Sequence, residues 1–302
     1  MPRSPVERPD AEILGYFDED FPSARAHFMA VCAGHGVECA EVAIAPGRGT
    51  LVVAEFGPRQ ATTKLVVLSG LHGVEAYAGS ATQIALLHGL AGRSGRVHVI
   101  LVHGINPLGA AAYQRTNPDN IDLNRNLVDD HATLARVDAR SRAVGALFSD
   151  PPLARLPDGL WLPIFLWRVI RLGGMRALKA AFAGGQFFDP AAPFFGGRQI
   201  APEVMTLLKV LKPRLAHADP AATILFDLHS GIGGARETSL MENGPTTAPL
   251  TAIFGVPIVD AHGGDGAVYP ARGDVGRGLK TWLGLDDAAG VTFECGTGPA
   301  LS

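Results

Sequence analysis

The stretch KLVVLSGLHGVEAYAGSATQIALLHGLAG, residues 64–92, runs from a buried strand through a glycine-framed turn into a helix. Its first part, residues 64–70, is a continuous apolar run of the kind found in strands that are buried on both faces. Residues 76–92 have apolar side chains at helical spacing, and a second apolar run, VHVILVHGIN, follows at 97–106. This order predicts a βαβ unit, and therefore a sheet that contains parallel strands.

Three further apolar runs, at 49–57, 222–230 and 252–260, extend this pattern to a central sheet covered by helices. The middle of the chain, about 131–221, differs, because its helical patterns are interrupted by proline-rich and glycine-rich segments. No segment has the composition of a hinge. We therefore expect a single domain over 1–302, with a helical insertion at about 131–221.

Composition excludes several classes of protein. Hydrophobic residues at 47% and charged residues at 18% indicate a globular chain rather than a disordered one. The net charge of -3, with no long basic run, argues against a nucleic-acid partner. The apolar stretch WLPIFLWRVIRL at 161–172 is too short to span a bilayer, so we expect a buried or surface-docked helix and no membrane partner.

The N-terminus and the cysteines indicate a cytoplasmic protein. The first 17 residues hold no apolar segment of the kind that secretory leaders contain. The three cysteines have no CxxC spacing, which fits reduced thiols better than a disulfide framework. The sequence gives no oligomeric state.

The turn after residues 64–70 contains an HxxE pair, His72 and Glu75. Residues three apart in a helical turn lie on one side of it, so this imidazole and this carboxylate can face one point. His229, at the end of the run at 222–230, is the best candidate for a third ligand. Two histidines and one carboxylate leave a coordination position open for water, as in catalytic zinc sites. Asp227 lies two residues earlier, on the same side of the strand, where it could orient a ligand.

Two more polar stretches support a site at this edge of the sheet. YQRTNPDNIDLNRN, residues 113–126, places arginine, asparagine and aspartate side chains in a short loop after a strand. VTFECGTG, residues 291–298, ends another strand with Glu294. A loop of this kind is usually only a solvated surface. Here the HxxE pair, this loop and the strand-end histidine follow one another along the chain, and together they argue for a site.

This ordered set resembles the zinc carboxypeptidase superfamily of the peptidase family M14 type. The stretches LHGVEAYAGSA, DLNRN, FDLHSGIG and FECGTG are most similar to its DUF2817 branch, and the resemblance spans about residues 50–298. It implies an α/β fold, a three-layer α/β/α sandwich around a mixed, mostly parallel sheet. The chain ends eight residues after Glu294, where this superfamily continues with another helix. We therefore expect either a truncated C-terminus or another element on that face.

The resemblance also implies roles for individual residues. His72, Glu75 and His229 would bind one Zn²⁺ per chain, and Glu294 would act as the general base and later as the proton donor. Arg115 would polarise the scissile carbonyl. The DLNRN loop would supply the remaining side chains. Asn124 and Arg125 would bind a substrate carboxylate, and Asp122 would hydrogen-bond the ring of His72.

The implied function is a zinc-dependent hydrolase that cleaves an amide bond next to a free carboxylate, most similar to a metallocarboxypeptidase. Its substrate would be a small peptide or an acyl amino acid. One alternative is an N-acyl amino acid deacylase of the aspartoacylase and succinylglutamate desuccinylase type, which shares HGxE, the arginine and DLNR. Another is a catalytically inactive binding domain on the same fold. A serine hydrolase and a nucleotide-binding protein are not favoured, because the chain has no GxSxG and no glycine-rich phosphate loop.

Three other features of the sequence concern the surroundings of the site. Tyr269 is a candidate for a substrate-side tyrosine by its order in the chain alone. Gln186 and the PFFGG segment at 193–197 either border the pocket or form a tight turn under an aromatic cluster. His103 ends a strand, as His229 does, and we expect it to have a hydrogen-bonded packing role.

Overall fold

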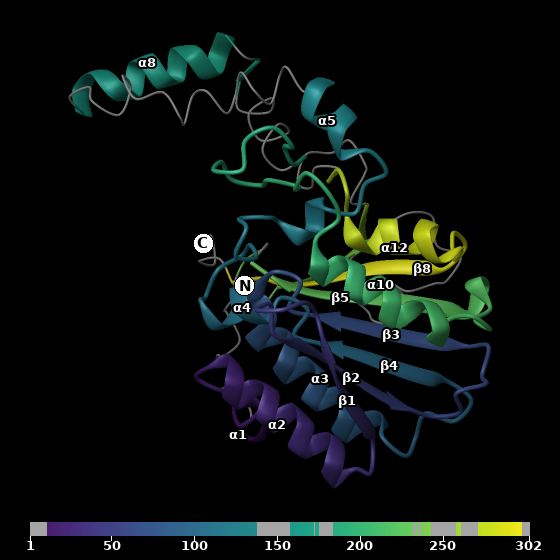
Figure 1. Ribbon diagram of the computed structural model, residues 1–302. Coiled ribbons are helices and arrows are strands. Elements are labelled where there is room, and N and C mark those ends of the chain that lie inside the picture. Colours follow the sequence, from purple (N-terminus) through teal and green to yellow (C-terminus); the bar gives the residue numbers. More distant parts are fainter. Residues whose placement is uncertain are drawn as a thin grey trace, which may run out of the picture.

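The computed structural model in Figure 1 describes residues 11–137, 158–171, 173–174, 184–231, 234, 237–242, 258–260 and 271–297. The strands in these residues are β1 (Glu38–Ala43), β2 (Thr50–Phe56), β3 (Lys64–Ser69), β4 (His98–His103), β5 (Thr223–Ser230), β6 (Thr238–Glu242), β7 (Ile258–Asp260) and β8 (Ala289–Cys295). They form one sheet in the order β1-β2-β4-β3-β5-β8-β6-β7. Parallel pairs join β4, β3, β5 and β8 in the centre, and antiparallel pairs lie on both sides. The predicted mixed sheet is confirmed.

The longer helices are α2 (Phe21–Gly34), α3 (Ala76–Leu90), α8 (Asp158–Arg171), α10 (Pro202–Arg214) and α12 (Val275–Leu283). The shorter ones are α1 (Ala11–Leu14), α4 (Pro107–Ala111), α5 (His131–Val137) and the 3-10 turns η1 (Gly73–Glu75), η2 (Leu123–Arg125) and η3 (Pro220–Ala222). Helix α3 connects the parallel strands β3 and β4, so the predicted βαβ unit is confirmed.

Helices cover both faces of the sheet (Figure 1). On one face, Phe28 of α2 and Ile84 of α3 pack against strand residues such as Val67. On the other, Leu207 of α10 and Leu279 of α12 belong to a second buried cluster. The chain is therefore the three-layer α/β/α sandwich that the resemblance implied. Helix α10 lies within the range 131–221 of the expected insertion, yet it is part of the layer that covers the sheet.

Two of the described strands were not predicted from the sequence. Strand β1 lies at the edge of the sheet, and most of its side chains are exposed, so it lacks the apolar run of a central strand. Strand β6, TSLME, has only five residues and pairs antiparallel with β8. Of the run at 252–260, only the part that forms β7 lies within the described residues.

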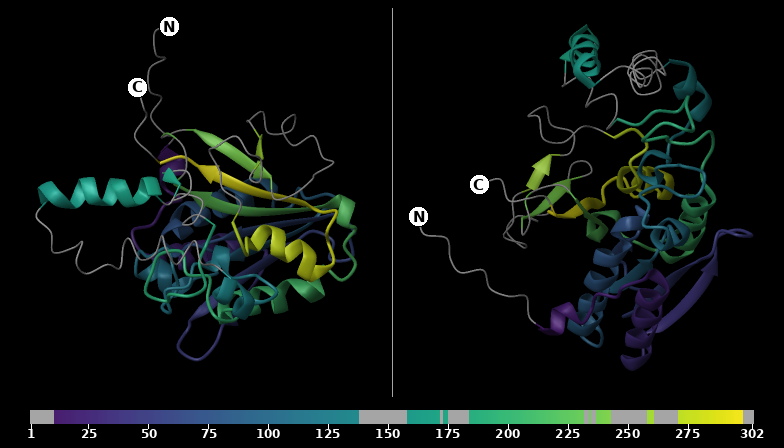
Figure 2. Two further views of the ribbon diagram at one scale, coloured as in Figure 1. Left: turned by 90° about the horizontal axis from the view of Figure 1, so that it is seen from above. Right: turned by 90° about the vertical axis from the view of Figure 1, so that its left-hand side faces the viewer.

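Helix α8 contains most of the apolar stretch at 161–172 and lies apart from the sheet in Figure 1 and in the right-hand view of Figure 2. Its Leu162, Leu166, Trp167 and Ile170 are exposed, Ile170 to 71%. No helix in the described part of the chain has the length and apolar character needed to cross a membrane.

The sheet brings distant parts of the sequence to one edge. In the parallel centre, β3, β5 and β8 end side by side, so the chain segments that follow them start at the same edge. His229 and Glu294 are register partners near the ends of β5 and β8. Neighbouring paired positions point to the same face, so both side chains project toward the same region.

Candidate metal centre

His72 and Glu75 lie in the tight turn that follows β3. The backbone N–H of Gly73 donates to the carbonyl of Arg115 at 3.2 Å, which holds this turn against the segment after α4. A Cβ on Gly73 would overlap the backbone of Gly109. Only glycine therefore allows the close approach that orients the two flanking side chains.

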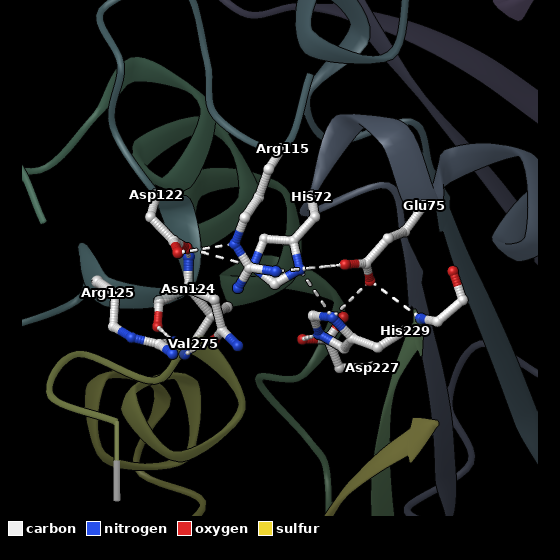
Figure 3. Close-up of polar contacts among 10 residues, drawn as sticks. His72, Glu75, Arg115, Asp122, Asn124, Arg125, Asp227, His229 and Val275 are labelled. Atoms are coloured by element: carbon white, nitrogen blue, oxygen red, sulfur yellow. Dashed lines mark hydrogen bonds and ion pairs between the residues drawn. The ribbon is translucent and has the colours of Figure 1, made fainter. Parts of the chain in front are cut away.

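The His72, Glu75 and His229 side chains converge on one point (Figure 3). The Glu75 carboxylate reaches both imidazoles, with 2.9 Å between Oε1 and His72 Nδ1 and 2.9 Å between Oε2 and His229 Nδ1. The two Nδ1 atoms are 3.0 Å apart. All three residues are buried, with exposures of 3%, 8% and 6%. The sequence-predicted ligand set is thus brought together in space.

The other ring nitrogen of each histidine faces an aspartate. Nε2 of His72 lies 3.2 Å from Asp122 Oδ1, and Nε2 of His229 lies 2.8 Å from Asp227 Oδ2. A carboxylate only accepts hydrogen bonds, so each Nε2 carries the proton and donates it. With that proton on Nε2, each Nδ1 faces the centre, where it can present a lone pair to a metal ion.

This donor set fits a zinc ion. Two imidazole lone pairs and a carboxylate cannot face one another at about 3 Å without positive charge between them, supplied by a proton or by a metal ion. Two nitrogens and one carboxylate are ligands that zinc takes, and three protein ligands are typical of its catalytic sites. Within the described residues, His72, Glu75 and His229 are the group of side chains that could hold a metal ion.

The pKa shifts follow from this arrangement. Burial raises the pKa of Glu75, but the two histidines outweigh it and hold that pKa well below its usual range. Burial lowers the pKa of His229, but the Asp227 and Glu75 carboxylates together raise it well above its usual range. Both directions show a site that attracts positive charge.

Glu294 lies beside this group without belonging to it. It is buried on β8, next to His229 on the neighbouring strand. Its Oε1 lies 3.9 Å from the position that a Cβ on Gly231 would occupy, so the carboxylate faces the segment just after β5. Glu294 is thus a buried carboxylate beside His229 that is not one of the three residues of the centre.

Arg115 is fixed at the edge of the centre. Its Nε donates to Asp122 Oδ2 at 3.0 Å, and its Nη1 lies 3.5 Å from Glu75 Oε1. The side chain is still 39% exposed. The guanidinium is therefore held in place by two carboxylates and retains an accessible side.

Asn124 and Arg125 lie in η2, close to Arg115 (Figure 3). Asn124 Oδ1 accepts from the backbone N–H of Val275 at 2.9 Å, which joins the loop to the start of α12. Arg125 is buried, and its Nη1 donates to the Asn124 carbonyl at 2.8 Å. Burial lowers the pKa of Arg125, and the Asp122 carboxylate opposes this shift.

The family model described as "Protein of unknown function (DUF2817)" matches residues 17–302. The chain belongs to the DUF2817 family. This match confirms the branch that the sequence resembled. A search of curated proteins found no match.

Solved structures of low sequence identity share the fold of this DUF2817 chain. Bovine thrombin-activatable fibrinolysis inhibitor, solved in complex with a tick carboxypeptidase inhibitor, is 12% identical, with a TM-score of 0.52 over 92% of this chain and 86% of that one. A Shewanella amazonensis protein, described provisionally as a metallopeptidase, is 15% identical, with a TM-score of 0.50 over 91% and 83% of the two chains. The carboxypeptidase-like fold is therefore confirmed.

His103 of the DUF2817 chain has the packing role that was predicted. Its Nε2 lies 3.0 Å from Ser80 Oγ, and its ring stacks against Phe21 and Phe28. Burial lowers its pKa to about 3. His103 is thus a neutral residue of the layer between the sheet and its helices.

Gln186 stabilises its own loop. Its Oε1 accepts from the backbone N–H groups of Phe188 and Asp189 at 3.1 and 2.9 Å, and its Nε2 donates to the Asp189 carbonyl at 2.6 Å. The PFFGG segment pairs with the loop before η2 through the Ile121–Phe195 bridge. Tyr269, the candidate substrate-side tyrosine, lies outside the described residues.

Two features of the site were missed in the sequence. One is α12, whose first N–H binds Asn124; the apolar residues of VGRGLKTWL recur at helical spacing, but nothing in that pattern indicates the contact with Asn124. The other is Phe194 of the PFFGG segment, whose ring lies beside both Arg115 and Arg125. The sequence left open whether the PFFGG segment borders the pocket or forms a tight turn, and it did not indicate this contact.

Proposed function

We propose that this chain is a zinc-dependent hydrolase that cleaves an amide bond next to a free carboxylate, most similar to a metallocarboxypeptidase-like peptidase. One observation carries the proposal. Two histidines with their Nε2 atoms held by aspartates turn both Nδ1 atoms toward the Glu75 carboxylate. The carboxypeptidase-like fold supports an enzyme of this broad class, because other proteins of that fold are hydrolytic.

In this proposal His72, Glu75 and His229 hold the zinc ion. A bound zinc ion supplies a positive charge that acidifies water beside it and polarises a carbonyl oxygen. Glu294 accepts a proton from the water molecule whose oxygen bonds to the amide carbon, and it later gives that proton to the nitrogen as the C–N bond breaks. Its buried position on the strand next to His229 supports this role.

The two arginines have separate roles. Arg115, held by Asp122 at one edge of its guanidinium, donates hydrogen bonds to the oxygen on which negative charge develops. Arg125, enclosed in the η2 loop, pairs with the free carboxylate of the substrate, for which its planar fork is suited. Asn124, the residue before Arg125, joins that loop to α12.

Hydrolysis of a substrate panel by the zinc-loaded protein tests this function. The panel pairs short peptides and N-acyl amino acids that have free carboxylates with amidated forms of the same compounds. We expect hydrolysis of the carboxylate forms, with peptides preferred over N-acyl amino acids, and weaker use of those forms by Arg125→Lys. Preference for N-acyl amino acids would favour the deacylase alternative. No hydrolysis by a folded, zinc-loaded chain would favour a binding domain.

A further inference from the structure

Phe194 has a backbone conformation that phenylalanine rarely adopts. Its φ is +57°, in the left-handed region, where a side chain crowds its own backbone. Hydrogen bonds fix the chain at Phe194 and at the next residue, since the Phe194 carbonyl accepts from Gln186 N at 3.0 Å and the Phe195 carbonyl accepts from Asp122 N at 2.8 Å. Glycine would take this conformation without strain. The presence of an aromatic side chain therefore calls for a role of its own.

The Phe194 ring contacts both arginines of the proposed site. The Cζ atom of Arg115 lies 5.6 Å from the ring centroid, and that of Arg125 lies 6.0 Å from it. A cation within about 6 Å of the face of a ring is attracted to it. Phenylalanine has no hydrogen-bond acceptor, so the ring stabilises the guanidiniums without using any of their N–H donors.

The loop that carries Phe194 is built closely around Arg125. A Cβ on Gly185 would lie 2.8 Å from Arg125 Cδ, and a Cβ on Gly196 would lie 2.7 Å from the Arg125 carbonyl oxygen. A Cβ on Gly273, before α12, would overlap that carbonyl group. Backbone from two separate segments thus encloses Arg125, and the Phe194 ring lies near its guanidinium as well as that of Arg115.

We propose that Phe194 is a positioning residue that holds the guanidiniums of Arg115 and Arg125 in one arrangement, and so selects substrates with a free carboxylate beside the scissile amide. Two like charges repel each other, and long arginine side chains have many rotamers. A ring shared by both guanidiniums counters the repulsion and reduces the ordering cost of binding an anion. This inference rests on the proposed function, because it assigns Arg115 to the carbonyl oxygen and Arg125 to the carboxylate.

Binding of a matched pair of small probes to the zinc-loaded protein tests this role without requiring turnover. The probes are N-acetyl-L-leucine and N-acetyl-L-leucinamide, with dissociation constants measured by calorimetry. For the wild type we expect the acid to bind on the order of tenfold more tightly than the amide, because it adds a hydrogen-bonded ion pair. Phe194→Leu keeps an apolar side chain but removes the ring, and should reduce that ratio about fivefold. Phe194→Tyr keeps the ring and should therefore keep most of the wild-type ratio of acid to amide binding.

Phe194→Gly separates this role from a structural one. Glycine relieves the left-handed backbone, so Tm should stay level or rise while the preference for the acid falls as in Phe194→Leu. Tyr113→Gly is a matched control, because Tyr113 is an exposed aromatic residue with φ of +53°. It should leave the ratio of acid to amide binding unchanged.

Three outcomes would overturn the inference. The first is that Phe194→Leu keeps the wild-type ratio of acid to amide binding. The second is that Phe194→Gly weakens acid and amide binding equally and also lowers Tm. The third is a wild type that binds acid and amide equally, which would also remove the carboxylate-binding role of Arg125. The wild type could hydrolyse nothing and still prefer the acid, with that preference lost in Phe194→Leu. This result would support the positioning role of Phe194 and contradict only the proposed hydrolysis.

Discussion

At the scale of single residues, the centre depends on which nitrogen of each histidine carries the proton. Asp122 and Asp227 accept from the two Nε2 atoms, so the two Nδ1 atoms are the ligand atoms. The aspartates thus determine the chemistry of the site without lying in its centre.

Asp227→Asn should weaken zinc binding while leaving the three ligands in place. The amide can present its N–H group to His229 Nε2, which would favour the tautomer with the proton on Nδ1 and remove the lone pair from the centre. Partners of this kind contribute about 10- to 100-fold to metal affinity. Competition with a zinc chelator would measure the change, and an affinity equal to that of the wild type would show that Asp227 does not set the tautomer.

Glu294→Gln should keep zinc and lose most of its turnover. Glutamine has the shape of glutamate but cannot accept the proton, and a general base contributes about 10²- to 10⁴-fold in rate. Zinc content and kcat, measured on the same preparation with the best substrate of the panel, check both halves of this expectation. Near-normal kcat would place the base at another residue.

At the scale of elements, the turn between β3 and α3 places two of the three ligands. The HxxE spacing predicted this turn, but the sequence could not show that Gly73 is packed against the segment after α4. That contact joins residues far apart in the chain, and a pattern within one segment carries no information about its neighbours.

Gly73→Ala should disturb the metal centre. A methyl group at this position would overlap the backbone of Gly109, so η1 must move and His72 and Glu75 must move with it. We expect a lower Tm and substoichiometric zinc. Gly89→Ala, within α3, is the control, because a Cβ there meets nothing within 4 Å. It should be neutral or stabilising by about 0.4–1 kcal/mol. Full zinc content in Gly73→Ala would show that the turn tolerates the shift.

The contact of α2 and α3 with β4 should make stability depend on pH through His103. Its pKa is about 3 in the folded chain, against about 6.5 when unfolded, so the unfolded chain binds more protons between these values. This contribution is fully present above about pH 6.5 and is lost as the pH falls toward 3. It amounts to a few kcal/mol. Denaturant titrations from pH 7 to 4 should show a smaller loss for His103→Gln, and an equal loss would contradict the assignment.

At the scale of the whole molecule, the sequence predicted the central strands and most of the site, because each is marked locally. Buried parallel strands are continuous apolar runs, and His72, Glu75, His229 and Glu294 lie at strand ends, which parallel pairing brings to one edge. The exposed edge strand β1 and the loop around Arg125 were not predictable in this way. Their structure depends on tertiary contacts, such as those of Phe194 with two arginines.

The proposed site depends on a metal ion that joins the turn after β3 to the end of β5. The most direct test is elemental analysis of the purified wild type and of His229→Ala. We predict about one zinc per chain in the wild type and a stoichiometry near zero in His229→Ala, with circular dichroism confirming that the variant is folded. A folded wild type that takes up no zinc when supplied with it, or a His229→Ala variant that keeps full zinc, would contradict the assignment of this centre.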